Sequence, residues 1–140
     1  FETRLFPNAY VYHKRRIDCD KFSIQVNKFG KARPILNSWY PQYNKLTFFF
    51  PTVFIIGFFL SIVLLLFNQD TLLQLYILYF LVLFLVSTYQ NKSLKIGYLS
   101  LIAVWKQFYG YGLGFLKSYI KVIIMKQKPQ EAFPELFFKI

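Results

Sequence analysis

Acidic residues are scarce in this sequence, and cysteine and histidine occur once each. Its 140 residues include 17 Lys and Arg but only six Asp and Glu, so the formal net charge is +11. Because Cys19 is the only cysteine, the chain can form no internal disulfide and no zinc site built on cysteines. The two longest apolar runs contain no acidic residue. Since acids inside membrane segments mark ion pathways, the sequence gives a transporter no evident pathway.

Apolar residues, by contrast, are abundant. The chain is 56% hydrophobic and 22% aromatic, above the roughly 45–50% apolar content of soluble domains. The run 46–67 has 22 residues without a charge. At ~1.5 Å per residue it would extend ~33 Å, enough for the ~30 Å hydrocarbon core of a bilayer. The run 71–89 adds 19 uncharged residues. The sequence therefore predicts a mainly α-helical membrane protein with two or three membrane segments.

The basic residues predict which side of the membrane each segment faces. Residues 1–45 hold nine of the 17 basic residues, and Lys92 and Lys95 follow the second run, whereas the connection 68–70 has none. Basic loops stay on the cytoplasmic side, so residues 1–45 and 90–95 are expected inside and residues 68–70 outside. Basic residues that flank membrane spans meet anionic lipid. Membrane lipids, and no nucleic acid, are therefore the expected partner of this charge.

A third apolar stretch, residues 96–116, has two possible placements. If it spans, the lysines after it lie outside, against the charge rule. Otherwise it is broken or interfacial, with Lys106 reaching the headgroups, and we favour this alternative. Gly110 and Gly114 fit a small-x-x-x-small packing face, but they would equally loosen the helix. The tail, residues 126–140, is expected to be an irregular surface segment.

The polar segment before the first span predicts a short strand followed by a helix. Residues 9–13 are rich in β-formers and follow a Pro-Asn turn signal. Asp18 is a suitable N-cap for a helix that would end at Gly30. One face of this helix is apolar and the neighbouring face is basic, which is typical of a helix at the membrane surface. Asp18 and Asp20 match the metal-binding pattern D-x-D, but N-capping accounts for them better.

Residues 7–34 resemble a known enzyme family. They contain, in order, Pro-Asn-Ala-Tyr-Val-Tyr-His-Lys-Arg-Arg, a helix beginning Lys-Phe and bearing Gln25, and the turn Phe-Gly-Lys-Ala-Arg, and membrane runs follow. This order resembles the end of the catalytic domain in membrane-bound family-2 glycosyltransferases of the bacterial polysaccharide-synthesis type. Residues 110–116, Gly-Tyr-Gly-Leu-Gly-Phe-Leu, are similar to a G-x-G-F-L stretch late in these enzymes.

The resemblance implies a fold and a domain organisation. Residues 1–45 would be the C-terminal end of a GT-A-like α/β domain with an interfacial helix. Residues 46–125 would form the membrane region, followed by the tail. The expected fold is thus a mainly α-helical membrane protein with a short α/β remnant. The chain begins with Phe1 rather than Met and has no Glu-Asp pair to supply a general base. The donor- and metal-binding half is therefore expected upstream.

The resemblance also implies an activity. The full-length enzyme would transfer a sugar, with inversion, from a nucleotide-sugar donor to a lipid-linked or polysaccharide acceptor. The reaction would take place at the cytoplasmic face of the bacterial inner membrane, which the chain would cross more than once. A divalent metal, Mg or Mn, is expected in the full-length enzyme and would not bind to this part alone. The 140 residues by themselves are expected to be inactive.

Four residues are candidates for contacts with substrate or metal, and no catalytic residue is expected in this chain. The resemblance suggests Arg16 and Arg33 for the donor diphosphate or acceptor, because Arg makes bidentate contacts with phosphate. It suggests Gln25 for the acceptor site, although Lys and Phe replace the Arg and Trp of the family's Q-x-x-R-W pattern. His13 would be a metal ligand or a structural group near the metal.

A different class of protein also fits the sequence. A small non-enzymatic basic membrane subunit could use residues 1–45 to bind anionic lipid or a partner protein. Charge alone would serve such a subunit, so Lys could replace Arg without loss. The two alternatives therefore differ in whether the planar guanidinium groups are required.

Overall fold

In the computed structural model of the chain, Arg4, Tyr12 and residues 18–137 are described. This part is almost entirely helical and contains no strand, so it gives no support to an α/β remnant. Apart from Tyr12, the expected strand at residues 9–13 lies outside the described residues. The longer elements are α1 (Cys19–Trp39), α2 (Phe50–Leu65), α3 (Thr71–Asn91) and α4 (Leu94–Ser118). The shorter ones are the π-helical η3 (Tyr119–Ile124), α5 (Pro129–Ala132) and three 3-10 turns, η1 (Pro41–Tyr43), η2 (Leu46–Phe49) and η4 (Pro134–Leu136).

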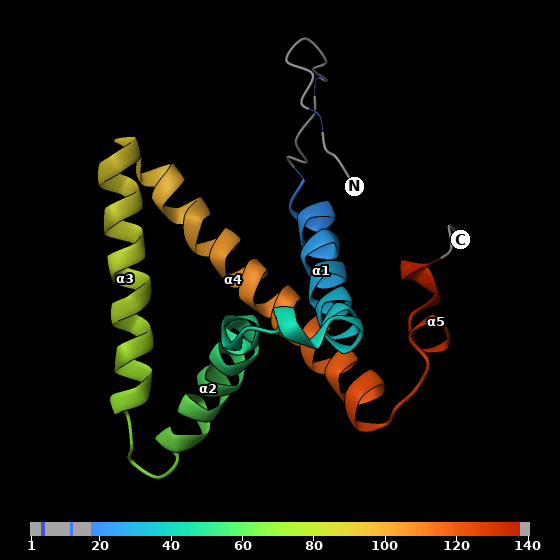
Figure 1. The fold of residues 1–140 in the computed structure, drawn as a ribbon. Coiled ribbons are helices and arrows are strands. Elements are labelled where there is room, and N and C mark those ends of the chain that lie inside the picture. Colours follow the sequence, from blue (N-terminus) through green and yellow to red (C-terminus); the bar gives the residue numbers. More distant parts are fainter. Residues whose placement is uncertain (1–3, 5–11, 13–17, 138–140) are drawn as a thin grey trace.

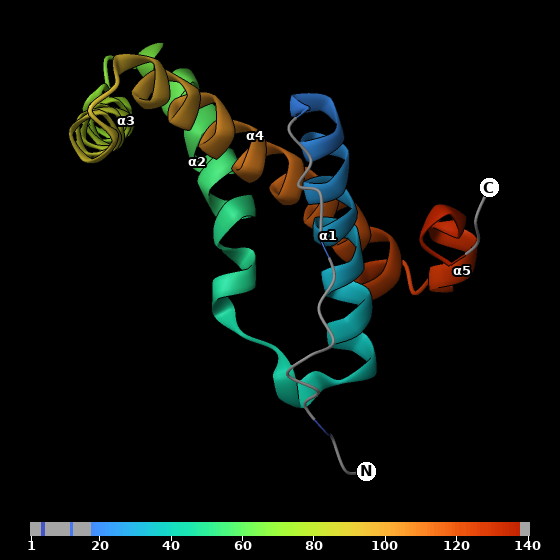
Figure 2. The same ribbon diagram turned by 90° about the horizontal axis from the view of Figure 1, so that it is seen from above.

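Three of the helices form a triangle (Figure 1). Helices α2 and α3 diverge from the short bend that joins them, and α4 runs from the end of α3 back to the start of α2. Helix α1 crosses the second half of α4, as the view turned by 90° also shows (Figure 2). The arrangement brings the first helix of the chain against its last long helix.

Helix α1 begins at the predicted N-cap but does not end where predicted. The Asp18 carboxylate accepts a hydrogen bond from the Asp20 backbone N–H at 2.8 Å, which confirms the capping role. The predicted end at Gly30 is wrong, because the helix continues through Gly30 and Pro34 to Trp39. A side chain at Gly30 would collide with the backbone carbonyl of Tyr111 on α4. This glycine therefore permits close helix packing and does not terminate the helix.

Replacing Asp18 with alanine is expected to destabilise the start of α1 by about 1 kcal/mol, because the N–H groups of the first turn lose their acceptor. Asp18→Asn keeps a side-chain oxygen at the same place and should cost much less. Thermal unfolding in detergent micelles, followed by circular dichroism, measures both variants. Equal losses from the two substitutions would contradict the capping role.

Two helical segments are long and apolar enough to cross a membrane. They are Leu46–Leu65 and Thr71–Asn91, close to the two runs that the sequence predicted. No residue of α3 is buried within the protein. Its exposed leucine, isoleucine and valine side chains suit a hydrocarbon environment. Two possible membrane helices are therefore present in the described part of the chain.

Helix α4 is continuous from Leu94 to Ser118, so the expected break in residues 96–116 is not found. Its glycines pack against neighbours on two sides and do not interrupt it. Gly110 and Gly114 face α1, where Asn27 Nδ2 donates to the Gly110 carbonyl at 2.9 Å. Gly112 faces α2, where Thr52 Oγ1 donates to its carbonyl at 3.1 Å. The small-x-x-x-small alternative is therefore the correct one for this helix.

The described part of the tail is docked and not an irregular surface segment. Phe133 is only 2% exposed and packs with Ile35 of α1 and Val122 of η3. Lys31 Nζ lies 3.0 Å from a carboxylate oxygen of Glu135. The side chain of Phe133 thus anchors the end of the chain on α1. The neighbouring prolines gave no indication of this docking.

Candidate functional site

A pocket of about 470 Å³ lies between α1 and α4. Helix α1 supplies Gln25 and Arg33, and α4 supplies Gln107 and Tyr111. Its remaining lining is apolar and comes from α1: Phe22, Val26, Phe29, Ala32 and Leu36. These positions recur every three or four residues, so they form one face of the helix. The pocket therefore combines a single cation and two amides with a mostly apolar surface.

Arg33 is held in place by two aromatic residues. Its guanidinium carbon lies 4.0 Å from the centre of the Phe48 ring, a cation–π contact. The guanidinium also forms a hydrogen bond with the Tyr111 side chain. Burial raises the pKa of the Tyr111 hydroxyl, and the charge and hydrogen bond of Arg33 act against this rise. Because a guanidinium carries five N–H donors, one bond to a hydroxyl leaves donors for an anionic ligand.

The structure brings together two of the four predicted site residues. Gln25 and Arg33 line the same pocket, two helical turns apart on α1. Arg16 and His13 lie outside the described residues, so their predicted roles stay predictions. Sequence reasoning missed Gln107 and Tyr111. Their only signals were a polar residue inside an apolar stretch and a tyrosine between two glycines.

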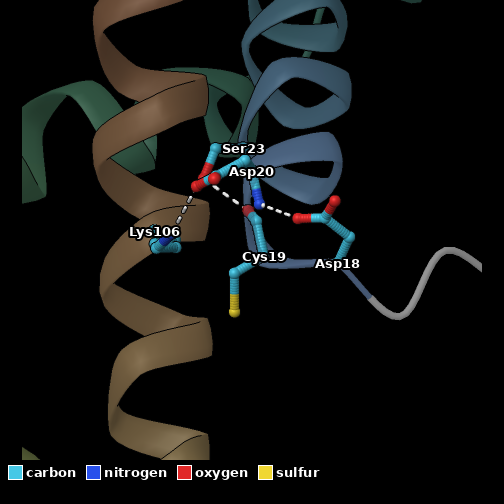
Figure 3. Close-up of polar contacts among 5 residues, drawn as sticks. All are labelled: Asp18, Cys19, Asp20, Ser23 and Lys106. Atoms are coloured by element: carbon cyan, nitrogen blue, oxygen red, sulfur yellow. Dashed lines mark hydrogen bonds and ion pairs between the residues drawn. The ribbon is translucent and has the colours of Figure 1, made fainter.

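The acidic pair at the start of α1 has structural partners (Figure 3). While Asp18 caps the helix, the Asp20 carboxylate lies 3.5 Å from Lys106 Nζ on α4. The Asp20 side chain is 90% exposed, so this ion pair contributes little stability. Lys106, which was expected to reach lipid headgroups, thus lies next to α1. The N-capping interpretation of the D-x-D match is confirmed, and Asp20 adds a contact between the two helices.

The described residues offer no group of ligands for the divalent metal that is expected in the full-length enzyme. Nowhere in the part of the chain that the structure describes do three His, Cys, Asp or Glu residues come together as a metal site would need. Asp18 and Asp20 supply only two carboxylates, with the contacts given above. We therefore derive no chemical step through a metal from this chain.

The pocket can bind an anion beside an apolar group. Arg33 offers charged N–H donors, and the Gln25 and Gln107 amides can each donate and accept hydrogen bonds. The phenylalanine and leucine side chains of the lining offer contacts to a hydrophobic part of the same ligand. Comparison with known proteins adds no family to this description: no family model, no curated protein and no solved structure matches the chain.

Proposed function

We propose that the chain is the C-terminal, membrane-proximal part of a family-2 type glycosyltransferase. The enzyme would transfer a sugar from a nucleotide-sugar donor to a lipid-linked or polysaccharide acceptor. The observation that carries the proposal is that Gln25 and Arg33, which the resemblance in residues 7–34 selects, line one pocket. That pocket lies on the helix that precedes the first possible membrane helix.

The chemistry of sugar transfer suits an arginine that is already fixed in position. The nucleoside diphosphate that leaves the donor carries negative charge, and cations positioned in advance stabilise such charge as it develops. Phe48 and Tyr111 limit the motion of Arg33, so less ordering is needed when a phosphate binds. Gln25 would contact the acceptor in the same pocket.

The remaining parts of the reaction belong to other residues of the enzyme. A catalytic domain ahead of residue 1 would bind the nucleotide and the Mg or Mn ion, with Arg16 and His13 as candidate contacts from this chain. We place the enzyme in the bacterial inner membrane, with residues 1–45 on the cytoplasmic side. There the pocket would lie beside acceptors that are held in the lipid.

Replacing Arg33 with lysine tests the proposal. Lysine keeps the positive charge but lacks the planar fork for phosphate and the stacking on Phe48. We expect the rate of sugar transfer to fall about tenfold, equivalent to about 1.4 kcal/mol. The assay follows labelled sugars from a panel of nucleotide sugars into lipid and glycan, in membranes that carry the product of the complete gene.

Lys28 provides the matched control, because it is an exposed cation on the same helix and does not line the pocket. Lys28→Ala should leave transfer unchanged. If the wild-type membranes transfer no sugar from any donor, the proposal fails. If Arg33→Lys transferred sugar at the wild-type rate, the pocket would have no role in the transfer. That result would favour the alternative, a non-enzymatic basic subunit that binds lipid by charge.

A further inference from the structure

Helix α4 touches two helix ends that lie far apart in the sequence. Near its start, a side chain at Gly97 would collide with Thr88 in the last turn of α3. Near its end, the backbone at Gly112 lies against Pro51 in the first turn of α2. The ring of Phe115 is 4.9 Å from that of Phe49, just before α2. Helix α4 therefore connects the end of α3 with the beginning of α2.

These two helix ends lie on the same side of a membrane if α2 and α3 each cross once. A chain that crosses and then returns starts its first span and ends its second on one side. With 25 residues, α4 is about 37 Å long, enough to cross a bilayer. The contacts at its two ends instead join helix ends on one side, and in Figure 1 it closes the open side between the diverging α2 and α3. Between these ends, Trp105 of α4 contacts Phe58 of α2 and Phe80 of α3.

We infer that the chain crosses the membrane twice, and that α1, α4 and the C-terminal segment form one layer on the side of residues 1–45. This topology is independent of the proposed enzyme activity. Helix α1 belongs to the layer because it precedes the first span and packs along the second half of α4 through Asn27 and Gly30. The partner of this layer is the headgroup region of the bilayer.

The docked tail gives an independent reason for the same placement. Phe133 packs against Ile35, and Glu135 pairs with Lys31, so the segment 129–137 is attached to α1. Helix α1 ends seven residues before the first possible span begins at Leu46. If α4 crossed the membrane, the tail would lie on the opposite side from α1. The tail contacts exclude that arrangement.

The charge distribution agrees with two crossings. The connection between α2 and α3, Leu66-Phe67-Asn68-Gln69-Asp70, contains no Lys or Arg, so two crossings leave all 17 basic residues on one side. A third crossing would move Lys117 and the four lysines after it to the other side. Anionic lipids are concentrated in the cytoplasmic leaflet and attract basic segments, each Lys or Arg contributing about 1 kcal/mol near the surface. The layer thus has the charge that this leaflet binds.

Cysteine labelling decides between two and three crossings. Cys19 is exposed and would react, so it is first changed to serine. Single cysteines are then introduced at exposed positions as Gln69→Cys, Gln90→Cys and Gln130→Cys. The probe is a membrane-impermeant maleimide, added to intact cells and then to permeabilised cells. All three residues are exposed; Gln69 and Gln130 lie outside the long helices and Gln90 lies in the last turn of α3, so the fold should be kept.

Cysteines at positions 90 and 130 are expected to react under the same condition, either in intact cells or only after permeabilisation. A cysteine at position 69 is expected to react under the other condition. This result supports two crossings whichever way the chain is oriented. Labelling of residues 69 and 130 together, with residue 90 on the other side, would show that α4 crosses and would overturn the inference. Labelling of all three under one condition would mean that α2 and α3 do not cross, and would overturn it too. Lys128→Cys repeats the measurement at a second exposed tail position.

Discussion

Replacing Phe133 with alanine is expected to detach the C-terminal segment from α1, at a cost of about 3–5 kcal/mol for the docked state. The ring is 2% exposed and fills the space between Ile35 and Val122. The ammonium groups of Lys31 and Lys121 lie 5.6 and 5.4 Å from its centre, so two cation–π contacts are lost as well. Hydrogen exchange of residues 126–137 in detergent micelles measures the detachment directly.

Phe133→Leu is the control for this prediction. Leucine keeps a buried apolar side chain and removes only the aromatic face, so its cost should stay below about 1.5 kcal/mol. Strong exchange protection of the tail in the alanine variant would show that Phe133 is not the anchor. Protection lost equally in both variants would assign the docking to the cation–π contacts instead of to apolar burial.

The ion pair between Lys31 and Glu135 makes the docking of the C-terminal segment on α1 depend on pH. The hydrogen bond from Lys31 holds the pKa of Glu135 below its ordinary value. A carboxyl group whose pKa is lower in the folded state stabilises that state above the unfolded pKa, and this contribution is lost as the pH falls through the folded pKa. Tail protection should therefore weaken in acid. Glu135→Gln, which cannot ionise, should remove that part of the pH dependence.

Replacing Gly30 with alanine is expected to destabilise the packing of α1 on α4 by about 1–3 kcal/mol. The added methyl group would collide with the Tyr111 backbone carbonyl, which no change of side-chain rotamer can move away. The higher helix propensity of alanine, about 1 kcal/mol, offsets only part of this cost. Thermal unfolding in micelles measures the net loss.

Gly110 is the matched control for Gly30, because it lies in the same helix crossing but has more room. The nearest atom to an added methyl there is the Ser23 carbonyl oxygen at 3.4 Å, an ordinary contact. Gly110→Ala should therefore be neutral or slightly stabilising. Equal destabilisation by the two alanines would contradict the backbone contact at Gly30 and would indicate a general intolerance of side chains in the crossing.

Local features of the chain were predictable from the sequence. The apolar runs correspond to the two possible membrane helices because length and lack of charge suffice to define such a helix. The N-cap at Asp18 was predictable because capping depends on neighbouring residues only. Both predictions use interactions within a few residues of the chain.

Features that depend on distant residues were not predictable in the same way. Gly30 fits a helix end as well as a close helix crossing, and only α4, some 80 residues later, decides between them. The tail was predicted to be irregular because its partners, Ile35 and Lys31, lie about 100 residues earlier. In the candidate site, the resemblance selected Gln25 and Arg33, but Tyr111 comes from the other helix. The position of Tyr111 follows from the crossing of α1 and α4 and not from any local sequence pattern.

The way in which α3 packs has a consequence for sequence variation. Tyr76 and Phe80 contact aromatic rings on α2 and α4, while Phe84 and Thr88 lie against Gly97. These four residues are spaced four apart and share one face of the helix. The leucine, isoleucine and valine positions of α3, none of which is buried, need only to stay apolar. Related chains would therefore differ at these positions and keep the helix in its place, with one apolar residue replacing another.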